Sequence, residues 1–281
     1  MNKSIPVIFL KNFVRRVAKL LISRKIPLKG FAKSTLRSPL DSISDNDLMF
    51  LNKALDWNCF TTDVNGRRLG NVAWRGKRSQ AQLIPDSRIV LMNKTFDLSN
   101  KSVLEVGCFE GVHTIGLQMF AKSVIAIDSR IEHIVKTVVR SSIYGFQPNV
   151  FQFDADDTDS RYELIKADTC HHVGVLYHLK DPVRHILKLG EQIKTGIMLD
   201  THIADDSDVL EQYNVGENIF HYKKYLEFGS GEVFSGMQDH SKWLTLSSLK
   251  NAIRLAGFLN VTVVEIRHER NGPRVLLFAE R

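Results

Sequence analysis

The chain has 281 residues, 43% of them hydrophobic and 25% charged, and this composition excludes a disordered or collagen-like protein. No apolar stretch approaches the ~18 residues that span a bilayer, so we expect no transmembrane segment. The three cysteines, Cys59, Cys108 and Cys170, are too widely spaced for a disulfide framework or a zinc cluster, and they predict a reducing, cytoplasmic environment. The net charge of +7 arises from residues 1–40, which hold ten Lys or Arg and no Asp or Glu. The other 241 residues hold 28 basic against 31 acidic side chains, so the body is near neutral.

Residues 1–44 are predicted to form a basic amphipathic leader followed by a linker. Apolar residues recur at helical spacing from Leu10 to Leu21, and basic residues occupy the other side. Such a helix can dock on its own domain, lie on an anionic membrane surface through residues 1–37, or contact nucleic-acid phosphates. Charges interrupt its apolar positions and no cleavage site follows, which argues against a secretory signal peptide. Residues 45–100 are predicted to form a small N-terminal cap.

From residue 101 to 281 the pattern alternates between strands and helices. Short apolar runs predict strands at 103–106, 124–127, 150–153, 169–175 and 197–203. Helical periodicity predicts helices at 112–120, 131–144 and 247–256, and Asp181-Pro182 marks the start of another as N-cap and first-turn proline. Two β-rich runs at 261–268 and 274–279, joined by a turn with Asn271-Gly272, predict a terminal hairpin. The predicted fold is α/β: a doubly wound, mostly parallel sheet of seven strands that ends in an antiparallel hairpin.

A glycine-containing loop follows the first of these strands, where such sheets bind ligands. It has the sequence Glu105-Val106-Gly107-Cys108-Phe109-Glu110-Gly111. Gly107 suits a tight turn, and Gly111 allows close backbone approach at the start of the helix. A dinucleotide fingerprint needs glycine at positions 109 and 112, where this chain has phenylalanine and valine, and no Walker lysine follows. The loop therefore indicates a cofactor without phosphates.

Three acidic residues end successive predicted strands around this loop. Asp128 closes the second strand and can accept both hydroxyls of a ribose. Asp154 and Ala155 follow the third strand, where an adenine amino group can donate to the carboxylate. An acid at one strand end is commonly a helix cap. Glu105, Asp128 and Asp154 together favour a nucleoside-bearing cofactor.

These motifs resemble those of class I S-adenosylmethionine-dependent methyltransferases over roughly residues 70 to 281. The resemblance implies a Rossmann-like fold, S-adenosyl-L-methionine as cofactor, and methyltransferase activity. It implies cofactor contacts from the residues that match the family's motifs: Trp74, Glu105, Gly107, Cys108, Gly111, His113, Asp128, Asp154, Ala155, Val173 and Tyr177.

A narrower resemblance is to the tRNA wobble-uridine carboxymethyltransferase branch. It is carried by Trp74-Arg75, by Gly111-Val112-His113, and by the stretch from Val173 to His178 with the following Asp181-Pro182. In that branch, a lysine in a Trp-Arg-Lys-Gly-Pro-Phe stretch holds the extra carboxylate of carboxy-S-adenosylmethionine. The nearest segment here, residues 57–60, has no lysine. We therefore expect ordinary S-adenosylmethionine.

Methyl transfer from a sulfonium requires mainly positioning, and a base is needed only when the acceptor must lose a proton. His178 is the candidate base and Tyr177 a wall of the methyl pocket, although both residue types also pack or cap helices for structural reasons. His171 and His172 fall inside a strand and are expected to pack or bond locally. No histidine cluster has zincin spacing, so no metal is predicted.

Residues 204–243 form a long, aromatic-rich connection that is predicted to be a substrate lid. Its rings can stack on a ligand or can simply pack the lid down. Three functions remain open from the sequence: a methyltransferase for a small-molecule, sugar (glycan) or lipid-linked acceptor, a tRNA or other RNA methyltransferase, and a non-catalytic scaffold. The near-neutral body lacks the basic stripe expected of an RNA-binding surface.

Overall fold

We describe the protein from a computed structural model. The structure describes residues 26–73, 76–157, 159–205, 207–208 and 210–281, together with Val14 and Val17. The expected leader helix lies outside these residues except for Val14 and Val17, which are both exposed. Trp74 also lies outside them. Within the described part of the chain, no helix has the length and apolarity needed to cross a membrane.

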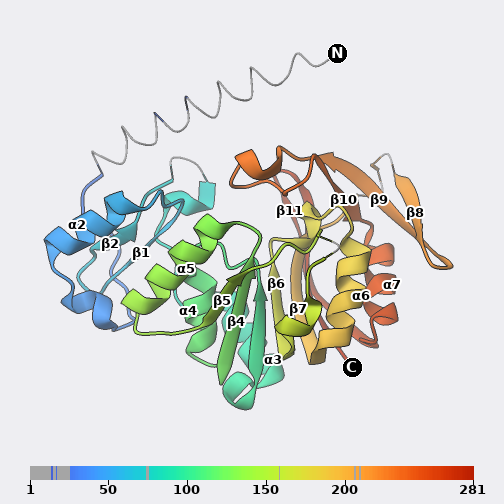
Figure 1. Ribbon diagram of the computed structural model, residues 1–281, viewed down its shortest axis with the longest axis horizontal. Coiled ribbons are helices and arrows are strands. Elements are labelled where there is room, and N and C mark those ends of the chain that lie inside the picture. Colours follow the sequence, from blue (N-terminus) through green and yellow to red (C-terminus); the bar gives the residue numbers. More distant parts are fainter. Residues whose placement is uncertain are drawn as a thin grey trace.

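A seven-stranded sheet forms the centre of the molecule, in the order β11-β12-β7-β6-β3-β4-β5 (Figure 1). Five strands are parallel: β3 Ser102–Val106, β4 Ser123–Asp128, β5 Asn149–Gln152, β6 Ala167–Val173 and β7 Ile193–His202. The C-terminal hairpin of β11 Asn260–Glu269 and β12 Gly272–Glu280 adds to β7 with β12 antiparallel. The predicted fold class, including the terminal hairpin, is confirmed.

Helices cover both faces of the sheet because its strands are apolar on both sides. On one face, α3 Ser87–Phe96, α4 Val112–Gln118 and α5 Ile131–Ile143 pack on a core that contains Val103 and Met198. On the other face, α6 Pro182–Gln192 and α7 Leu246–Leu255 pack on a core that contains Leu104 and Leu199. Successive strand residues thus serve opposite cores, and each fully buried aliphatic side chain contributes roughly 1.5–3 kcal/mol.

Local sequence signals place several helix ends as expected. The side chain of Asp181 accepts a hydrogen bond from the backbone N–H of Arg184 and so caps α6, whose first residue is Pro182. Gly145 follows α5 with a φ of +83°, a conformation that glycine adopts without strain. The fourth strand has the predicted length but begins and ends two residues earlier than predicted, at Ala167 and Val173. It ends there because Gly174 turns the chain with a φ of +78°.

The N-terminal region combines α2 Asp45–Ala54 with a ribbon of β1 Phe60–Thr62 and β2 Arg68–Gly70. Residues 26–44, where we expected a linker, are packed against this ribbon. Arg68 donates to the backbone carbonyls of Ile26 and Pro27, and Leu40 is fully buried beside Leu69. Short 3-10 helices complete the chain: η1 Pro39–Ser42, η2 Gly76–Ser79, η3 Leu98–Asn100, η4 Tyr162–Ile165, η5 Leu176–His178 and η6 Gly229–Gly231.

The long connection after β7 is a three-stranded antiparallel sheet rather than an irregular loop. It consists of β8 Glu211–Val215, β9 Asn218–Leu226 and β10 His240–Leu244, in the order β10-β9-β8 (Figure 1). Phe220 and Trp243 are almost fully buried, and Phe228 is mostly exposed. Several of the predicted lid aromatics therefore hold this sheet on the body.

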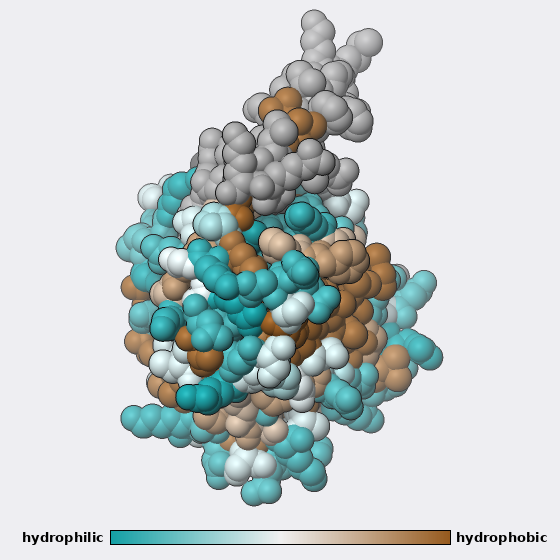
Figure 2. Space-filling view, turned by 90° about the vertical axis from the view of Figure 1, so that its left-hand side faces the viewer, coloured by the Kyte–Doolittle hydropathy of each residue, from teal (hydrophilic) through white to brown (hydrophobic). Residues whose placement is uncertain are grey.

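The side of the molecule on which α2 lies carries apolar side chains among polar ones (Figure 2). Among the described residues, Met49 and Phe50 of α2 are 40% and 69% exposed. Leu40, Leu48 and Leu69 by contrast are fully buried and form a separate small core with Ile115 of α4. The N-terminal region is thus fixed to the sheet domain through apolar packing.

One buried carboxylate joins the N-terminal region to the glycine loop. Glu110 is fully buried and accepts hydrogen bonds from the backbone N–H groups of Asn58 and Cys59, at 2.7 and 3.0 Å, and from Lys136 at 3.1 Å. Arg140 lies 3.8 Å away and is stacked on Trp57. Burial raises the pKa of Glu110, but the charges of Lys136 and Arg140 outweigh it and the net pKa is lowered. Glu110 therefore stays ionised.

We predict that Glu110→Gln lowers the free energy of unfolding by about 3 kcal/mol, because removing one partner of a buried ion pair leaves the other charges uncompensated. Urea unfolding of the full chain measures this. Glu163→Gln is the matched control, since Glu163 is exposed on η4 and should change stability by less than about 0.5 kcal/mol. Equal stability of the two variants would show that Glu110 does not hold the two regions together.

Candidate active site

The glycine loop keeps the backbone path of a glycine-rich turn although a phenylalanine occupies its middle. Gly107, Phe109 and Gly111 have φ angles of +80°, +52° and +79°. The N–H groups of Gly107 and Cys108 donate to the carbonyl of Ile127 in β4, at 2.8 and 3.0 Å. Phe109 thus adopts a left-handed conformation that glycine favours, and its ring packs edge-on against His133 with centroids 4.8 Å apart. The loop therefore keeps this backbone path despite the substitution.

Asp128 ends β4 directly beside this loop. Its Oδ2 accepts the backbone N–H of Phe109 at 3.1 Å, and its Oδ1 accepts the N–H of Arg130 at 3.0 Å and lies 2.9 Å from Nδ1 of His133. The carboxylate is 9% exposed. An ionised carboxylate offers about four acceptor positions, so these contacts orient Asp128 and leave capacity for a ligand hydroxyl.

The third strand end lies next to Asp128 in the sheet, because β5 pairs with β4. Asp154 is half-buried and accepts the N–H of Asp156 at 3.0 Å. Ala155 is 7% exposed, and its carbonyl accepts from the hydroxyl of Tyr162 at 3.3 Å. Asp154 and Ala155 therefore form part of a turn that follows β5, at the edge of the sheet where we expected them.

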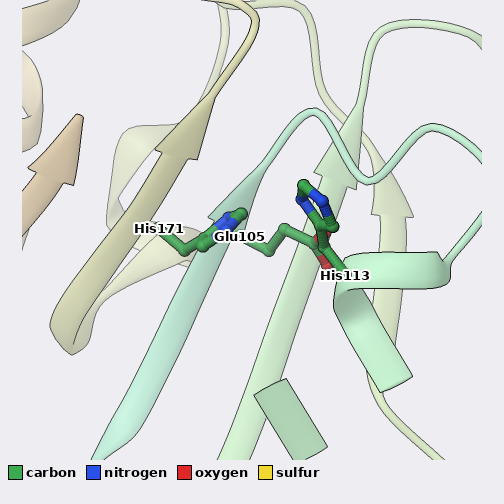
Figure 3. Close-up of side chains that lie close together, drawn as sticks. All are labelled: Glu105, His113 and His171. Carbon is green, nitrogen blue, oxygen red and sulfur yellow. The ribbon is translucent and has the colours of Figure 1, made fainter. Parts of the chain in front are cut away.

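Glu105, His113 and His171 converge on the other side of the loop, between the sheet and α4 (Figure 3). Their nearest donor or acceptor atoms all lie within 4.8 Å of one another. Thr114 donates to Oε2 of Glu105, and burial raises the pKa of Glu105 to about 8. His171 is 1% exposed, and burial holds its pKa well below the usual value.

Glu105, His113 and His171 are residue types that bind metals. The sequence did not predict this cluster, because its members do not have the spacing of a known metal motif. A guanidinium group lies against it, because Nη2 of Arg88 is 3.3 Å from Nε2 of His113. Arg88 is itself paired with Asp86 and Asp200, at 2.8 and 2.9 Å, which balances much of its charge. The cluster therefore offers carboxylate and imidazole atoms that can bind either a metal ion or the ammonium group of a ligand.

Tyr177 and His178 lie on η5, directly after β6. The ring of Tyr177 contacts His202 edge-on at 4.8 Å, and the guanidinium carbon of Arg274 lies 5.3 Å from its centroid. Burial raises the pKa of Tyr177, so its hydroxyl is neutral at pH 7. Nδ1 of His178 lies 2.9 Å from Oε1 of Glu227, a residue that follows β9 in the lid. The histidine therefore has the oriented geometry of a general base.

Two carboxylates of this region were not predicted from the sequence. Glu227 is one, and Asp200 near the end of β7 is the other. Asp200 is fully buried and binds Arg88 and Arg267 at 2.9 Å, together with Arg274. Neither carboxylate is marked by a local motif, since the contacts that join them to this region span 49 positions from Glu227 to His178 and 112 from Asp200 to Arg88.

The remaining predicted residues divide into two groups. Gly107, Gly111, Asp128, Glu105 and His113 surround the loop as expected. Cys108 and Val173 turn their side chains into the core below it, and Cys108 is 2% exposed and accepts from Thr137 at 3.3 Å. These two residues offer backbone atoms only. His172 bonds locally, with Nε2 3.0 Å from Nε2 of His185.

Comparison with known proteins matches residues 78–263 to the methyltransferase domain family. The tRNA U34 carboxymethyltransferase of Alteromonas mediterranea is 27% identical over 179 residues, which cover 61% of this chain and 48% of that protein. The Shewanella piezotolerans protein of the same name is 32% identical over 114 residues, which cover 40% of this chain and 34% of that protein. The chain thus matches about half or less of the length of these curated relatives.

Among solved structures, the N-terminal domain of EvdMO1, crystallised in the presence of SAH and D-fucose, has a TM-score of 0.70. It is 19% identical and the alignment covers 85% of this chain and 97% of that domain, a likeness of fold. The family match covers about two thirds of the chain. The chain therefore belongs to the methyltransferase domain family, as the glycine loop and strand-end acids predicted.

Proposed function

We propose that the protein is an S-adenosylmethionine-dependent methyltransferase that acts on a small-molecule, sugar or lipid-linked acceptor. The observation that carries this proposal is the contact between Asp128 and the N–H of Phe109, which places a strand-end carboxylate against the glycine loop. Family membership supports the reaction type. The solved domain with SAH, whose fold this chain shares, supports the cofactor.

Buried polar atoms around the loop fit such a cofactor. Among the described residues, Oε1 of Glu105, both ring nitrogens of His171 and Nε2 of His133 are buried without a hydrogen-bond partner. Buried polar groups are rarely left unpaired, so each of these atoms indicates a missing ligand or water. Glu105 and His171 lie on one side of the loop, and His133 lies beside Asp128 on the other. A ligand with an amino-acid end and a ribose would reach both.

In this assignment each residue has a distinct role. Asp128 accepts the ribose hydroxyls, Glu105 accepts the ammonium, and Asp154 with Ala155 contacts the adenine. Gly107 and Gly111 let the backbone approach the ligand, and Trp74 stays a predicted contact. S-adenosylmethionine supplies, when bound, an electrophilic methyl group on a positively charged sulfur. Tyr177 walls the methyl pocket and excludes water, and Nε2 of His178 takes the proton from a hydroxyl or amine acceptor.

We predict that Asp128→Asn weakens S-adenosylhomocysteine binding by about 10- to 100-fold, because hydrogen bonds to a charged group contribute about 1.5–3 kcal/mol. Calorimetric titration of the full chain measures the affinity. A 2′-deoxy analogue should bind the native protein more weakly than S-adenosylhomocysteine does. The Asp128→Asn variant should bind the two ligands with nearly equal affinity.

Asp168→Asn is the matched control, since Asp168 lies at the opposite end of β6, where it accepts from Ser102. Its affinity for S-adenosylhomocysteine should equal that of the native protein. Native affinity in Asp128→Asn would remove the ribose role of Asp128.

Glu105 should make cofactor binding depend on pH. With a pKa of about 8, its carboxyl is mostly protonated below pH 8 in the free protein. An adjacent ligand ammonium favours the ionised form, so binding releases a proton and affinity rises from pH 6 to 8, then levels off. We predict a slope approaching tenfold per pH unit, measured by calorimetry in buffers of different ionisation enthalpy. The slope should vanish in Glu105→Gln and persist in His113→Asn, and a slope unchanged in Glu105→Gln would contradict the assignment.

A tRNA acceptor is the second candidate, and the curated relatives named tRNA U34 carboxymethyltransferase favour it. The segment nearest to the relatives' carboxylate-binding stretch has a different environment here. Trp57 is fully buried under Arg140, and Asn58 and Cys59 bind Glu110. This packing favours a structural role for residues 57–60 and ordinary S-adenosylmethionine as the cofactor. A non-catalytic scaffold would transfer no methyl group to any acceptor, whether it binds S-adenosylhomocysteine or has lost this ability.

The basic leader distinguishes these acceptor classes. Because Arg68 holds the carbonyls of Ile26 and Pro27, a truncation that spares the packed body should end at residue 25. For a lipid-linked acceptor, we expect truncation to abolish sedimentation with anionic liposomes and to preserve S-adenosylhomocysteine affinity. For a tRNA acceptor, it should instead flatten the salt dependence of tRNA binding. A truncated protein that sediments like the full chain would exclude the leader as a membrane contact.

A further inference from the structure

A buried carboxylate in the lid contacts the candidate base. Glu227 is 8% exposed and accepts four hydrogen bonds. Oε1 contacts Nδ1 of His178 and Oγ of Ser241, both at 2.9 Å, and Oε2 accepts Oγ of Ser235 at 2.6 Å and the N–H of Gly236 at 2.9 Å. These contacts fill the acceptor capacity of a carboxylate, so Glu227 has one fixed orientation.

The protonation of this pair follows from its environment. Burial raises the pKa of Glu227, but the hydrogen bonds from His178, Ser235 and the N–H of Gly236 outweigh it, and the net pKa lies below the ordinary value. Glu227 is therefore ionised at neutral pH and can only accept hydrogen bonds. Nδ1 of His178 must then carry the proton, and Nε2 of the neutral ring holds the lone pair that a base needs.

The lid is shaped to make this contact. A Cβ atom at Gly236 would lie 2.4 Å from the carbonyl oxygen of His178, so only glycine permits the observed approach. The N–H of Lys242 in β10 donates to the carbonyl of Leu179 at 3.0 Å. The lid segment 227–242 is thus docked on η5 through its backbone as well as through Glu227.

The same segment is held from the cofactor side. Nη2 of Arg130 donates to the carbonyls of Gly229, Glu232 and Ser235, at 3.3, 2.9 and 3.0 Å. The backbone N–H of Arg130 in turn binds Asp128. The ring of Phe234 lies 5.8 Å from that of Phe109 in the glycine loop. The lid segment therefore joins the glycine loop, Asp128 and His178.

We infer that Glu227 is a positioning residue that fixes the tautomer of His178, so that the docked lid completes the base for a hydroxyl or amine acceptor. This inference rests on the proposed function, in which His178 is the base. Glu227 touches neither cofactor nor acceptor in this account, and it acts only through His178. A lid that is displaced removes the carboxylate and leaves His178 without a fixed tautomer.

The test is the tautomer itself, measured by two-dimensional proton–nitrogen NMR of the full chain with ¹⁵N-labelled histidine. The signals of His178 are identified by their loss in His178→Gln. In the native protein at a pH where the ring is neutral, we expect the proton on Nδ1. In Glu227→Gln, which lacks the charge and whose amide can donate to Nδ1, we expect the proton on Nε2. The native spectrum alone is decisive if the variant does not fold: a proton on Nε2 there overturns the inference.

Glu211→Gln is the matched control, because Glu211 lies on β8 of the same lid sheet and accepts from Tyr222 at 2.8 Å. It should leave the His178 signals unchanged. An identical tautomer in the native protein and Glu227→Gln also overturns the inference. Failure of S-adenosylhomocysteine to bind would instead remove the proposed function, and it is measured separately by calorimetry.

Discussion

The carboxylate of Asp128 is the point on which the candidate site depends. It fixes the N–H of Phe109 in the glycine loop, the N–H of Arg130 at the start of α5, and a ring nitrogen of His133. The side chain of Arg130 in turn donates hydrogen bonds to three backbone carbonyls of the lid. One charged group at a strand end thus holds together the loop, a helix and the lid, and it has acceptor capacity left for a ligand.

Two further buried carboxylates attach neighbouring segments to the same centre. Glu110 ties the N-terminal segment at Asn58 and Cys59 to the loop, and Glu227 ties the lid to His178. Each is held by several donors, and in each the favourable contacts outweigh burial and keep the group ionised. Buried charges of this kind are costly unless fully paired, so they specify how the segments dock rather than adding large stability.

The sheet and its helices could be predicted because their signals are local. Apolar runs marked the strands, Asp181-Pro182 marked the start of α6, and Gly107 with Asp128 marked the edge of the sheet at which we propose that the cofactor binds. The lid strands were missed because much of this sheet is uncovered: β8 has no buried residue, and β9 has only two. Each of Glu110, Glu227 and Asp200 has a partner 49 or more positions away in the chain, and no sequence period records such pairs. Phe109 shows the opposite case, in which an unfavourable residue keeps the expected backbone path through a left-handed conformation.

We propose that the glycine loop and Asp128 hold S-adenosylmethionine or its demethylated product. The most direct measurement is calorimetric titration of the full chain with S-adenosylhomocysteine, with NAD as the control ligand. We expect micromolar affinity for S-adenosylhomocysteine and no measurable binding of NAD, because the loop lacks the glycines of a pyrophosphate clamp. Absence of S-adenosylhomocysteine binding, or binding of NAD in its place, would contradict this proposal.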